Sequence, residues 1–292
     1  MTPAADAPDE RVGWIGLGNI GAPMARRLVE HPGGLVVCDV VADATVPFAD
    51  AGATVAPDAA GVVAAGATVV SVMVRDDAQV RQVVGDLLAA GPAEGTLIAV
   101  HSTIRPETAE DLATVALRHG VHLADAPVSG GAMGAATGRL AVLLGGDASV
   151  VERCRAAFAA FADLVVHFGP AGAGTRAKIA RNLVTFAGFA VVGEALRLAE
   201  ASGLDLVGLG EVVRHSDAVT GGAGAIMLRD ETGPLAADDG LRPIFGHTLA
   251  LGSKDLDLAL ALAADAGLDL PLTAAARRGL APALGLEDTD AP

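Results

Sequence analysis

A lysine and an asparagine four residues apart have the side chains needed to move a proton and position a substrate. On a helix, Lys178 and Asn182 would share one face. Of the 20 basic residues only Lys178 and Lys254 are lysines. An arginine keeps its proton at any useful pH, whereas a desolvated lysine can release it. If the pair faces a cleft, the amine would be a proton shuttle and the amide a positioner; the alternative is a solvated helix face.

A serine followed by two glycines could hold a small carboxylate. Ser129, Gly130 and Gly131 come shortly after an apolar segment that ends at Asp125. The serine offers a hydroxyl, and the glycines offer unhindered backbone N–H groups. If the segment is a strand, this loop lies at the carboxyl edge of a sheet, where open α/β folds bind ligands. An ordinary glycine turn explains the same residues, so both interpretations stay open.

A glycine-rich segment near the N-terminus has the spacing of a dinucleotide site. Gly16, Gly18 and Gly21 form the pattern G-x-G-x-x-G directly after the apolar run Val12–Ile15. Such glycines allow a tight turn and bring the backbone close to a pyrophosphate at the N-terminus of the next helix. Asp39, about 20 residues further on, is the acid expected to accept the ribose hydroxyls.

The residues around Asp39 favour NAD over NADP. A carboxylate at this position repels a 2′-phosphate, and Val40 and Val41 supply no arginine to hold one. The alternative is a structural glycine turn followed by an unrelated surface aspartate.

The composition excludes several kinds of chemistry and partner. The 292 residues carry a formal net charge of −15 and include no tyrosine. The missing tyrosine excludes the Tyr–Lys pair of short-chain dehydrogenases. The negative field repels nucleic acid and anionic membranes, and a small carboxylate substrate could bind only through a local positive or backbone-donor site. Cys38 and Cys154 lack metal-ligand spacing, and we expect no metal site.

The N-terminal sequence carries no recognisable targeting segment. It lacks the basic and apolar regions of a signal peptide, and no uninterrupted apolar run reaches the roughly 18 residues that a membrane span needs. We therefore expect a cytoplasmic protein.

Two successive patterns predict the elements that position these residues. Up to residue 168, apolar β-branched runs alternate with helical stretches, which predicts a Rossmann-type, doubly wound, mostly parallel sheet. After residue 168 only helical periodicity is present, which predicts an all-helical domain entered through one long helix. The expected strands are 12–15, 35–39, 68–74, 96–100, 121–125, 140–144 and 164–168. The expected helices are 22–30, 77–90, 106–118, 149–160, 174–201, 206–215, 245–266 and 273–283.

This organisation predicts three segments. Residues 1–10 form a loose N-terminal tail, residues 11–168 a dinucleotide-binding domain, and residues 169–292 a helical domain for substrate binding and dimerisation.

Four motifs in this order resemble the β-hydroxyacid dehydrogenase family, which includes 3-hydroxyisobutyrate dehydrogenase and tartronate semialdehyde reductase. The resemblance runs from about Arg11 to Leu284. The motifs are GLGNIGAPMARRL at 16–28, DAPVSGGAMGAATGRL at 125–140 with the two glycines 145–146, the helix that carries Lys178 and Asn182 after Gly172 and Gly174, and KDLDLA at 254–259.

The resemblance implies that the protein reversibly oxidises a small 3-hydroxy acid, similar to 3-hydroxyisobutyrate, to its semialdehyde with NAD, as a homodimer or homotetramer. It implies that Lys178 is the general acid/base and that Asn182 orients this lysine and the substrate. The implied substrate-binding residues are Ser129, Gly130, Gly131 and Lys254. The implied cofactor-binding residues are Gly16, Leu17, Gly18, Asn19, Ile20, Gly21, Asp39, Met73, Val74, Ser102, Thr103 and Lys254. For Lys254, a surface ion pair with Asp255 is the alternative.

Four residues depart from the family pattern. Arg75 replaces a proline of the family pattern, and His101 replaces an aspartate. Arg181 replaces an asparagine, and His247 replaces a phenylalanine. Arg75, Arg181 and His247 would add positive or hydrogen-bonding character to the cleft. We therefore expect a substrate more polar or more acidic than 3-hydroxyisobutyrate.

Two alternative functions remain compatible with the scaffold. One is imine reduction, although such enzymes usually carry Asp or Tyr at the position of Lys178 and a basic stretch at that of Asp39. The other is a dinucleotide-binding module without catalysis, against which the retained Lys178 and Asn182 argue.

Overall fold

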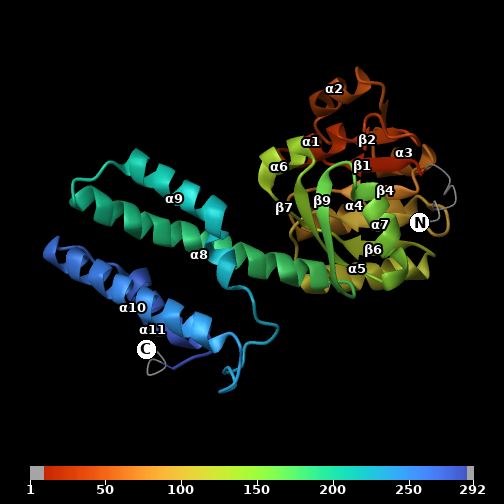
Figure 1. The fold of residues 1–292 in the computed structure, drawn as a ribbon. Coiled ribbons are helices and arrows are strands. Elements are labelled where there is room, and N and C mark those ends of the chain that lie inside the picture. The colour runs from red at the N-terminus through yellow and green to blue at the C-terminus, as the bar shows by residue number, and fades with distance from the viewer. Residues whose placement is uncertain (1–9, 288–292) are drawn as a thin grey trace. The chain divides into compact units, whose positions relative to one another are not determined.

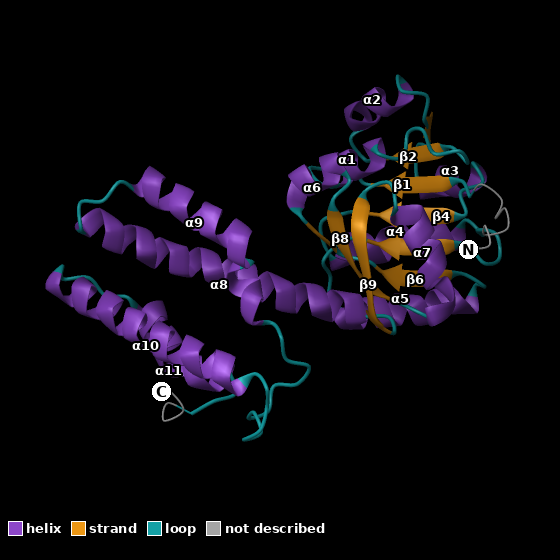
Figure 2. Ribbon diagram, viewed as in Figure 1, coloured by secondary structure: helices purple, strands orange, loops and turns teal. Residues whose placement is uncertain are grey.

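The computed structural model describes residues 10–287, and the chain divides into two compact units between Arg181 and Asn182. The first unit contains all the strands, and the described residues of the second are helical or loop (Figures 1 and 2). The division falls within α8 (Ala173–Ala201), so both units include part of this helix. Of the N-terminal tail expected at residues 1–10, only residue 10 lies within the described residues.

A nine-stranded sheet forms the centre of the first unit, in the order β3-β2-β1-β4-β5-β6-β8-β7 with β9 paired to β8. β8 runs antiparallel to β6 and β7, and the other pairs are parallel, which confirms the mostly parallel sheet. The strands are β1 (Val12–Ile15), β2 (Leu35–Cys38), β3 (Thr54–Val55), β4 (Val69–Val72), β5 (Leu97–Val100), β6 (His122–Asp125), β7 (Val128–Ser129), β8 (Leu140–Gly145) and β9 (Ala162–Gly169).

The central strands are apolar because both faces of the sheet are covered. Every residue of β1, β2, β4 and β5 is buried. Successive side chains point to opposite faces, so Trp14 belongs to one core cluster and Ile15 to the other. The helices of this unit are α1 (Gly21–Arg26), α2 (Val46–Ala49), α3 (Ala59–Ala64), α4 (Asp77–Ala89), α5 (Pro106–Arg118), α6 (Gly131–Thr137) and α7 (Val151–Phe158).

The sequence prediction differs from the structure mainly in short elements. The first helix ends at Arg26 and not at residue 30; turns follow, and Leu28 is buried from one of them, so the apolar spacing continues past the helix. Strands β3 and β7 have two residues each, and helices α2, α3 and α6 have four to seven. Such lengths are too short to produce a readable periodicity.

The second unit continues α8 and adds α9 (Leu206–Thr220), α10 (Arg242–Asp265) and α11 (Pro271–Ala283). Glu194 of α8 caps α11, because its carboxylate accepts hydrogen bonds from the backbone N–H groups of Leu272 (2.9 Å) and Thr273 (2.8 Å) and from the Thr273 hydroxyl (2.7 Å). A glycine in the left-handed conformation, Gly221 (φ +86°), ends α9.

In the described part of the chain, α8 is the one helix whose length and apolar composition would allow it to cross a membrane. Its uncharged stretch, however, extends only over the 12 residues from 182 to 193, between Arg181 and Glu194. That is shorter than the roughly 18 residues that a span requires.

Candidate active site

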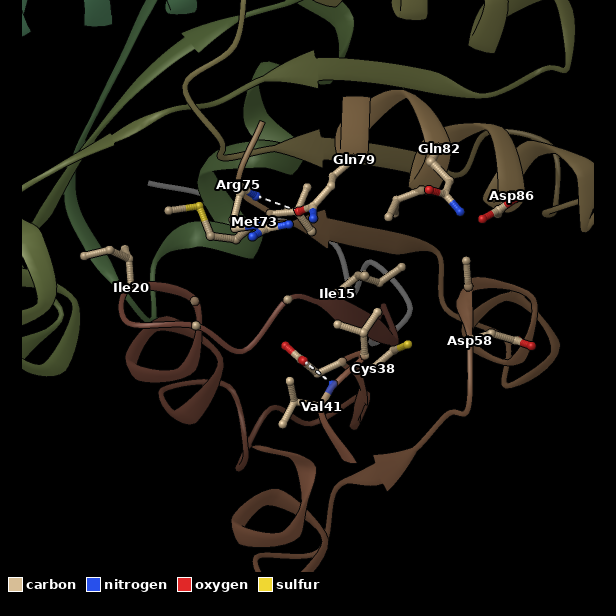
Figure 3. Close-up of a pocket in the computed structure, with 18 of the residues that line it drawn as sticks. Ile15, Ile20, Cys38, Val41, Asp58, Met73, Arg75, Gln79, Gln82 and Asp86 are labelled. Atoms are coloured by element: carbon tan, nitrogen blue, oxygen red, sulfur yellow. Dashed lines mark hydrogen bonds between the residues drawn. The ribbon is translucent and has the colours of Figure 1, made fainter. Parts of the chain in front are cut away.

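A cavity of about 730 Å³ opens at the carboxyl ends of β1, β2 and β4 (Figure 3). It lies where a doubly wound sheet binds nucleotides. Its walls are the glycine-rich loop, the end of β2, the start of α3, the loop after β4 and one face of α4. The lining residues are Ile15, Gly16, Gly18–Gly21, Cys38–Val41, Pro57–Ala59, Met73–Arg75, Gln79, Gln82, Val83 and Asp86.

Each of the three glycines of the loop is suited to its position for a different physical reason. Gly16 has φ +100°, and a Cβ there would overlap the carbonyl of Met73. A Cβ on Gly21 would overlap the carbonyl of Gly16. Gly18 has nothing within 4 Å of the place a Cβ would take, so it leaves open space on the cavity side. Two glycines thus permit the tight turn, and the third leaves room for a ligand against the backbone.

Asp39 connects the end of β2 to the glycine-rich loop. One carboxylate oxygen accepts a hydrogen bond from the N–H of Leu17 at 2.6 Å, and the other accepts one from the N–H of Val41 at 2.8 Å. Each oxygen retains a lone pair that can accept from a ribose hydroxyl. Open space at Gly18 and this carboxylate are features that fit a nicotinamide dinucleotide.

Three predicted cofactor residues of the first unit do not line the cavity: Leu17, Ser102 and Thr103. Ser102 is buried behind the loop after β4, where its hydroxyl accepts from the N–H of Val74 (2.9 Å) and donates to the Val74 carbonyl (2.7 Å). Leu17 is buried and contributes its backbone N–H to Asp39. Thr103 is exposed and does not line the cavity. The other predicted cofactor residues of the first unit do line the cavity: Gly16, Gly18, Asn19, Ile20, Gly21, Asp39, Met73 and Val74.

Several lining residues were missed by the sequence prediction. Asp58 caps α3, and Gln79, Gln82 and Asp86 lie on α4. No motif marks them. The spacing of Gln79, Gln82 and Asp86 by three and four residues places them on one face of that helix, which is the only signal the sequence offers.

The start of α8 is locked against the sheet by a buried carboxylate. Asp125, at the end of β6, is fully buried and accepts hydrogen bonds from the backbone N–H groups of Gly172 (2.7 Å) and Thr175 (2.6 Å). A Cβ on Gly174 would overlap the carbonyl of Leu143, so glycine permits this close approach. The helix therefore leaves the sheet edge in a fixed direction, with Lys178 one turn further on.

Lys178 has the properties expected of a titrating amine. The residue is 9% exposed. Burial, and to a lesser extent the nearby positive charge of Arg181, lowers the pKa of Lys178 below its usual value. Within the described residues, no hydrogen bond or ion pair of Lys178 is present that would hold its proton. Asn182 is half-buried one turn further along the same helix.

The other predicted substrate residues lie outside the nucleotide cavity. Ser129 ends β7 and is half-buried, while Gly130 (φ +130°) and Gly131 (φ +64°) begin α6. These three and Lys178 do not line the nucleotide cavity. Lys254 is exposed on α10 and forms an ion pair with Asp255 at 2.7 Å.

His101 is part of the packing beneath the cavity. It is fully buried, stacks on Trp14 with ring centroids 5.5 Å apart, and hydrogen-bonds the Ser71 hydroxyl (3.1 Å) and the Ala126 carbonyl (2.8 Å). Burial lowers the pKa of His101 to about 4, although the bond to the Ala126 carbonyl acts the other way. The indole N–H of Trp14 in turn donates to the Gly16 carbonyl at 3.0 Å, so the stack supports the glycine-rich loop.

Of the three cationic or polar departures expected to alter the substrate, only Arg75 lines the nucleotide cavity. Arg181 and His247 are exposed, on α8 and α10. Among residues 10–287, no cluster of three or more His, Cys, Asp or Glu side chains could hold a metal ion.

Family models match both parts of the chain. Residues 11–169 match the NAD-binding domain of 6-phosphogluconate dehydrogenase, and residues 172–291 match the NAD-binding domain of NADP-dependent 3-hydroxyisobutyrate dehydrogenase.

Individual relatives cover most of the chain. A NAD-dependent L-serine dehydrogenase from Pseudomonas aeruginosa is 37% identical over 254 residues, which are 86% of this chain and 84% of that protein. The crystal structure of a putative oxidoreductase from Mycobacterium avium has a TM-score of 0.90 at 52% identity and covers 94% of this chain and 98% of that one. A 3-hydroxyisobutyrate dehydrogenase structure from Mycobacterium tuberculosis, described with L-serine, has a TM-score of 0.65 at 33% identity, covering 96% and 97%.

An imine reductase from Myxococcus stipitatus has a TM-score of 0.73 and covers 92% of this chain and 92% of its own, but at 19% identity this likeness concerns the fold alone. The family models and the relatives above 30% identity go further. The chain belongs to the β-hydroxyacid dehydrogenase family, as an oxidoreductase that uses a nicotinamide cofactor.

Proposed function

We propose that this enzyme oxidises a small 3-hydroxy acid, of the 3-hydroxyisobutyrate or serine kind, reversibly to its semialdehyde with NAD. The observation that carries the proposal is Lys178: a buried amine of lowered pKa on a helix anchored to the sheet by Asp125. The relatives described with 3-hydroxyisobutyrate and L-serine support the substrate class.

In the proposed reaction Lys178 acts as the base. Its neutral amine accepts the proton of the substrate hydroxyl while the carbinol C–H bond breaks, and the carbonyl forms as the O–H bond is lost. When bound, the nicotinamide supplies the acceptor for the hydride. Asn182 positions the lysine and the hydroxyl. The hydroxyl of Ser129 and the N–H groups of Gly130 and Gly131 hold the substrate carboxylate.

NAD is the proposed cofactor in preference to NADP. Asp39 carries a negative charge where a 2′-phosphate would lie, and Val40 and Val41, which follow it, are exposed and uncharged. Replacing Asp39 with Asn should weaken NAD binding and narrow its advantage over NADP, as measured by the two dissociation constants.

We also propose that the protein is a cytoplasmic homodimer or homotetramer. Large apolar side chains are exposed along α8 in the single chain, which supports association with further copies. The net charge of −15 argues against nucleic acid or an anionic membrane as partner, and a small carboxylate would be held through the local donors of Ser129, Gly130 and Gly131.

The first test is nicotinamide absorbance with NAD⁺ and NADP⁺ over a panel of acids: 3-hydroxyisobutyrate, 3-hydroxypropionate, glycerate, serine, threonate and 4-hydroxybutyrate. We expect turnover of at least one of them with NAD⁺. Turnover of a cyclic imine with NADPH, and none of any acid, would favour imine reduction. Binding of NADH without turnover of either class would favour a non-catalytic module.

The base is tested by Lys178→Ala and Lys178→Arg. Both should reduce kcat by about a thousandfold or more with NADH affinity nearly unchanged, because arginine keeps the charge but cannot cycle a proton. Substantial activity in Lys178→Arg would contradict the assignment. Lys254→Arg and Lys254→Ala are the matched variants: unchanged kinetics in both would show that Lys254 forms only its surface ion pair with Asp255.

A further inference from the structure

The walls of the nucleotide cavity carry an unequal set of charges. Three lining side chains are carboxylates, Asp39, Asp58 and Asp86. Among the lining residues, Arg75 is the one with a positive charge. A dinucleotide brings two negative charges on its pyrophosphate into this acidic surrounding, in a chain whose net charge is already −15. Backbone N–H groups of the glycine-rich loop provide partial charges only, so a cation in the cavity matters to binding.

The backbone of Arg75 is fixed while its side chain is not engaged. Its N–H donates to the side-chain carbonyl of Gln79 at 3.1 Å, and Asp76 caps α4 through the N–H of Gln79 at 2.9 Å. Within the described part of the chain, the guanidinium makes no hydrogen bond or ion pair. It is therefore available to a ligand.

Arg75 lies next to the segment that touches the glycine-rich loop. Figure 3 shows it beside Met73 and Gln79, on the wall of the cavity across from Val41 and Cys38. The carbonyl of Met73 is the group that a Cβ on Gly16 would strike. The loop after β4 and the glycine-rich turn are thus in contact, with Arg75 two residues beyond that contact.

We propose that Arg75 is a cofactor-binding residue that clamps the pyrophosphate of the dinucleotide from the side opposite the glycine-rich loop. A guanidinium binds phosphate oxygens in a two-pronged manner that the proline of the family pattern could not provide. Arg75 then raises affinity for the cofactor and does not select an acidic substrate, which was the role expected from the sequence. This inference rests on the proposed use of a nicotinamide dinucleotide.

The test is direct binding of NADH, NADPH and adenosine by calorimetry to the wild type, Arg75→Gln and Arg75→Lys. Arg118→Gln is the matched control, because it removes one charge at the exposed end of α5, away from the cavity. Arg75→Gln should raise the dissociation constant of NADH and of NADPH at least about tenfold, since charge-assisted bonds to phosphate are strong. Arg75→Lys should lie between, and Arg118→Gln should stay within about twofold of the wild type.

Two further readouts separate charge from packing. Adenosine has no phosphate, so its affinity should be the same in wild type and Arg75→Gln. The dependence of NADH affinity on salt should be weaker in Arg75→Gln, because one ionic contact is gone.

Four results would overturn the proposal: NADH affinity within twofold of wild type in Arg75→Gln, an equal loss for adenosine, a loss confined to NADPH, or a changed KM for the hydroxy acid with unchanged NADH affinity. In the last case Arg75 would serve the substrate. Each leaves the proposed dehydrogenase function standing, whereas a wild type that binds neither NADH nor NADPH would overturn that function itself.

Discussion

The two units of the chain bury their apolar side chains to very different degrees. In the first unit, four consecutive neighbours of the sheet are buried at every residue, and large core clusters lie on both faces. In the second, one small cluster centres on Phe245 and Leu249, and α9 buries none of its residues. The first unit has the core of an independently stable domain, whereas the second leaves many of its large apolar side chains exposed.

The exposed apolar residues of the helical part are large and close together. On α8, Phe186 and Phe189 are 61% and 65% exposed, and their rings meet edge to face with centroids 5.8 Å apart. Leu183, one turn earlier, is 69% exposed. This apolar surface is where the proposed association of copies would take place, whereas the cofactor cavity lies in the first unit.

The largest expected effect comes from a charge on this apolar surface. Phe186→Asp should raise the dissociation constant of the oligomer by about a thousandfold or more, because an unpaired carboxylate would have to be buried. Sedimentation velocity measures it. Leu117→Asp, at a residue 65% exposed on α5 of the first unit, is the control and should leave the oligomer intact. An unchanged oligomer in Phe186→Asp would contradict the proposal that copies of the chain associate through this surface of α8.

A cavity in the first unit should have the next largest effect. Leu144, on β8, is fully buried in one of the core clusters. Leu144→Ala should lower the free energy of unfolding by about 3 kcal/mol, from lost burial and the cavity left behind. Urea unfolding measures this. Leu117→Ala removes the same atoms at an exposed position and should cost under about 0.5 kcal/mol.

The stability of the first unit should fall in mild acid because of His101. The buried ring resists protonation until about pH 4, whereas the unfolded chain binds the proton near 6.5. Stability is therefore fully present above pH 6.5 and is lost progressively between pH 6.5 and 4, by roughly 3 kcal/mol. His101→Gln should flatten this slope, measured by urea unfolding at several pH values. His119→Gln, at an exposed position, is the control and should leave the slope as in the wild type.

The smallest expected effect is the loss of a helix cap in the second unit. Burial raises the pKa of the Glu194 carboxyl, but the hydrogen bonds from Thr273 and Leu272 outweigh it and hold the pKa below its ordinary value. The cap therefore stabilises the unit above the usual pKa of glutamate, and this contribution is lost as the pH falls through the lowered pKa. Glu194→Gln should cost about 1 kcal/mol near neutral pH. Calorimetric melting checks this against Glu200→Gln at an exposed position on the same helix.

Motifs predicted the parts of the cofactor cavity whose geometry is local. The glycine-rich turn and Asp39 are recognisable because the backbone conformation of one short segment requires those residue types. The long helices and buried strands were predictable for a similar reason, since each repeats its period several times.

Residues that meet only in the folded chain could not be predicted from the sequence. His101 looked like a substitution in the cofactor site, yet its partners are Trp14 from β1 and Ser71 from β4, which come together through strand pairing. Arg75 follows the predicted cofactor residues Met73 and Val74 and lines the cavity with them, but the carboxylates that share this cavity with it, Asp39, Asp58 and Asp86, come from distant parts of the chain. Asp125 was recognised as part of a motif, but its role as the anchor of α8 depends on a turn some 50 residues away.

The stack of Trp14 on His101 gives the protein a built-in fluorophore. Trp14 is the one tryptophan of a chain without tyrosine, and its indole N–H is bonded to the carbonyl of Gly16 in the turn that lines the cavity. All indole emission therefore originates from a side chain bonded to the glycine-rich turn of the cofactor cavity. Reduced nicotinamide absorbs in the range where tryptophan emits, so resonance energy transfer from this one donor would follow cavity occupancy in the unlabelled enzyme. Because the donor packs against the imidazole of His101, the same emission would also follow protonation of that ring.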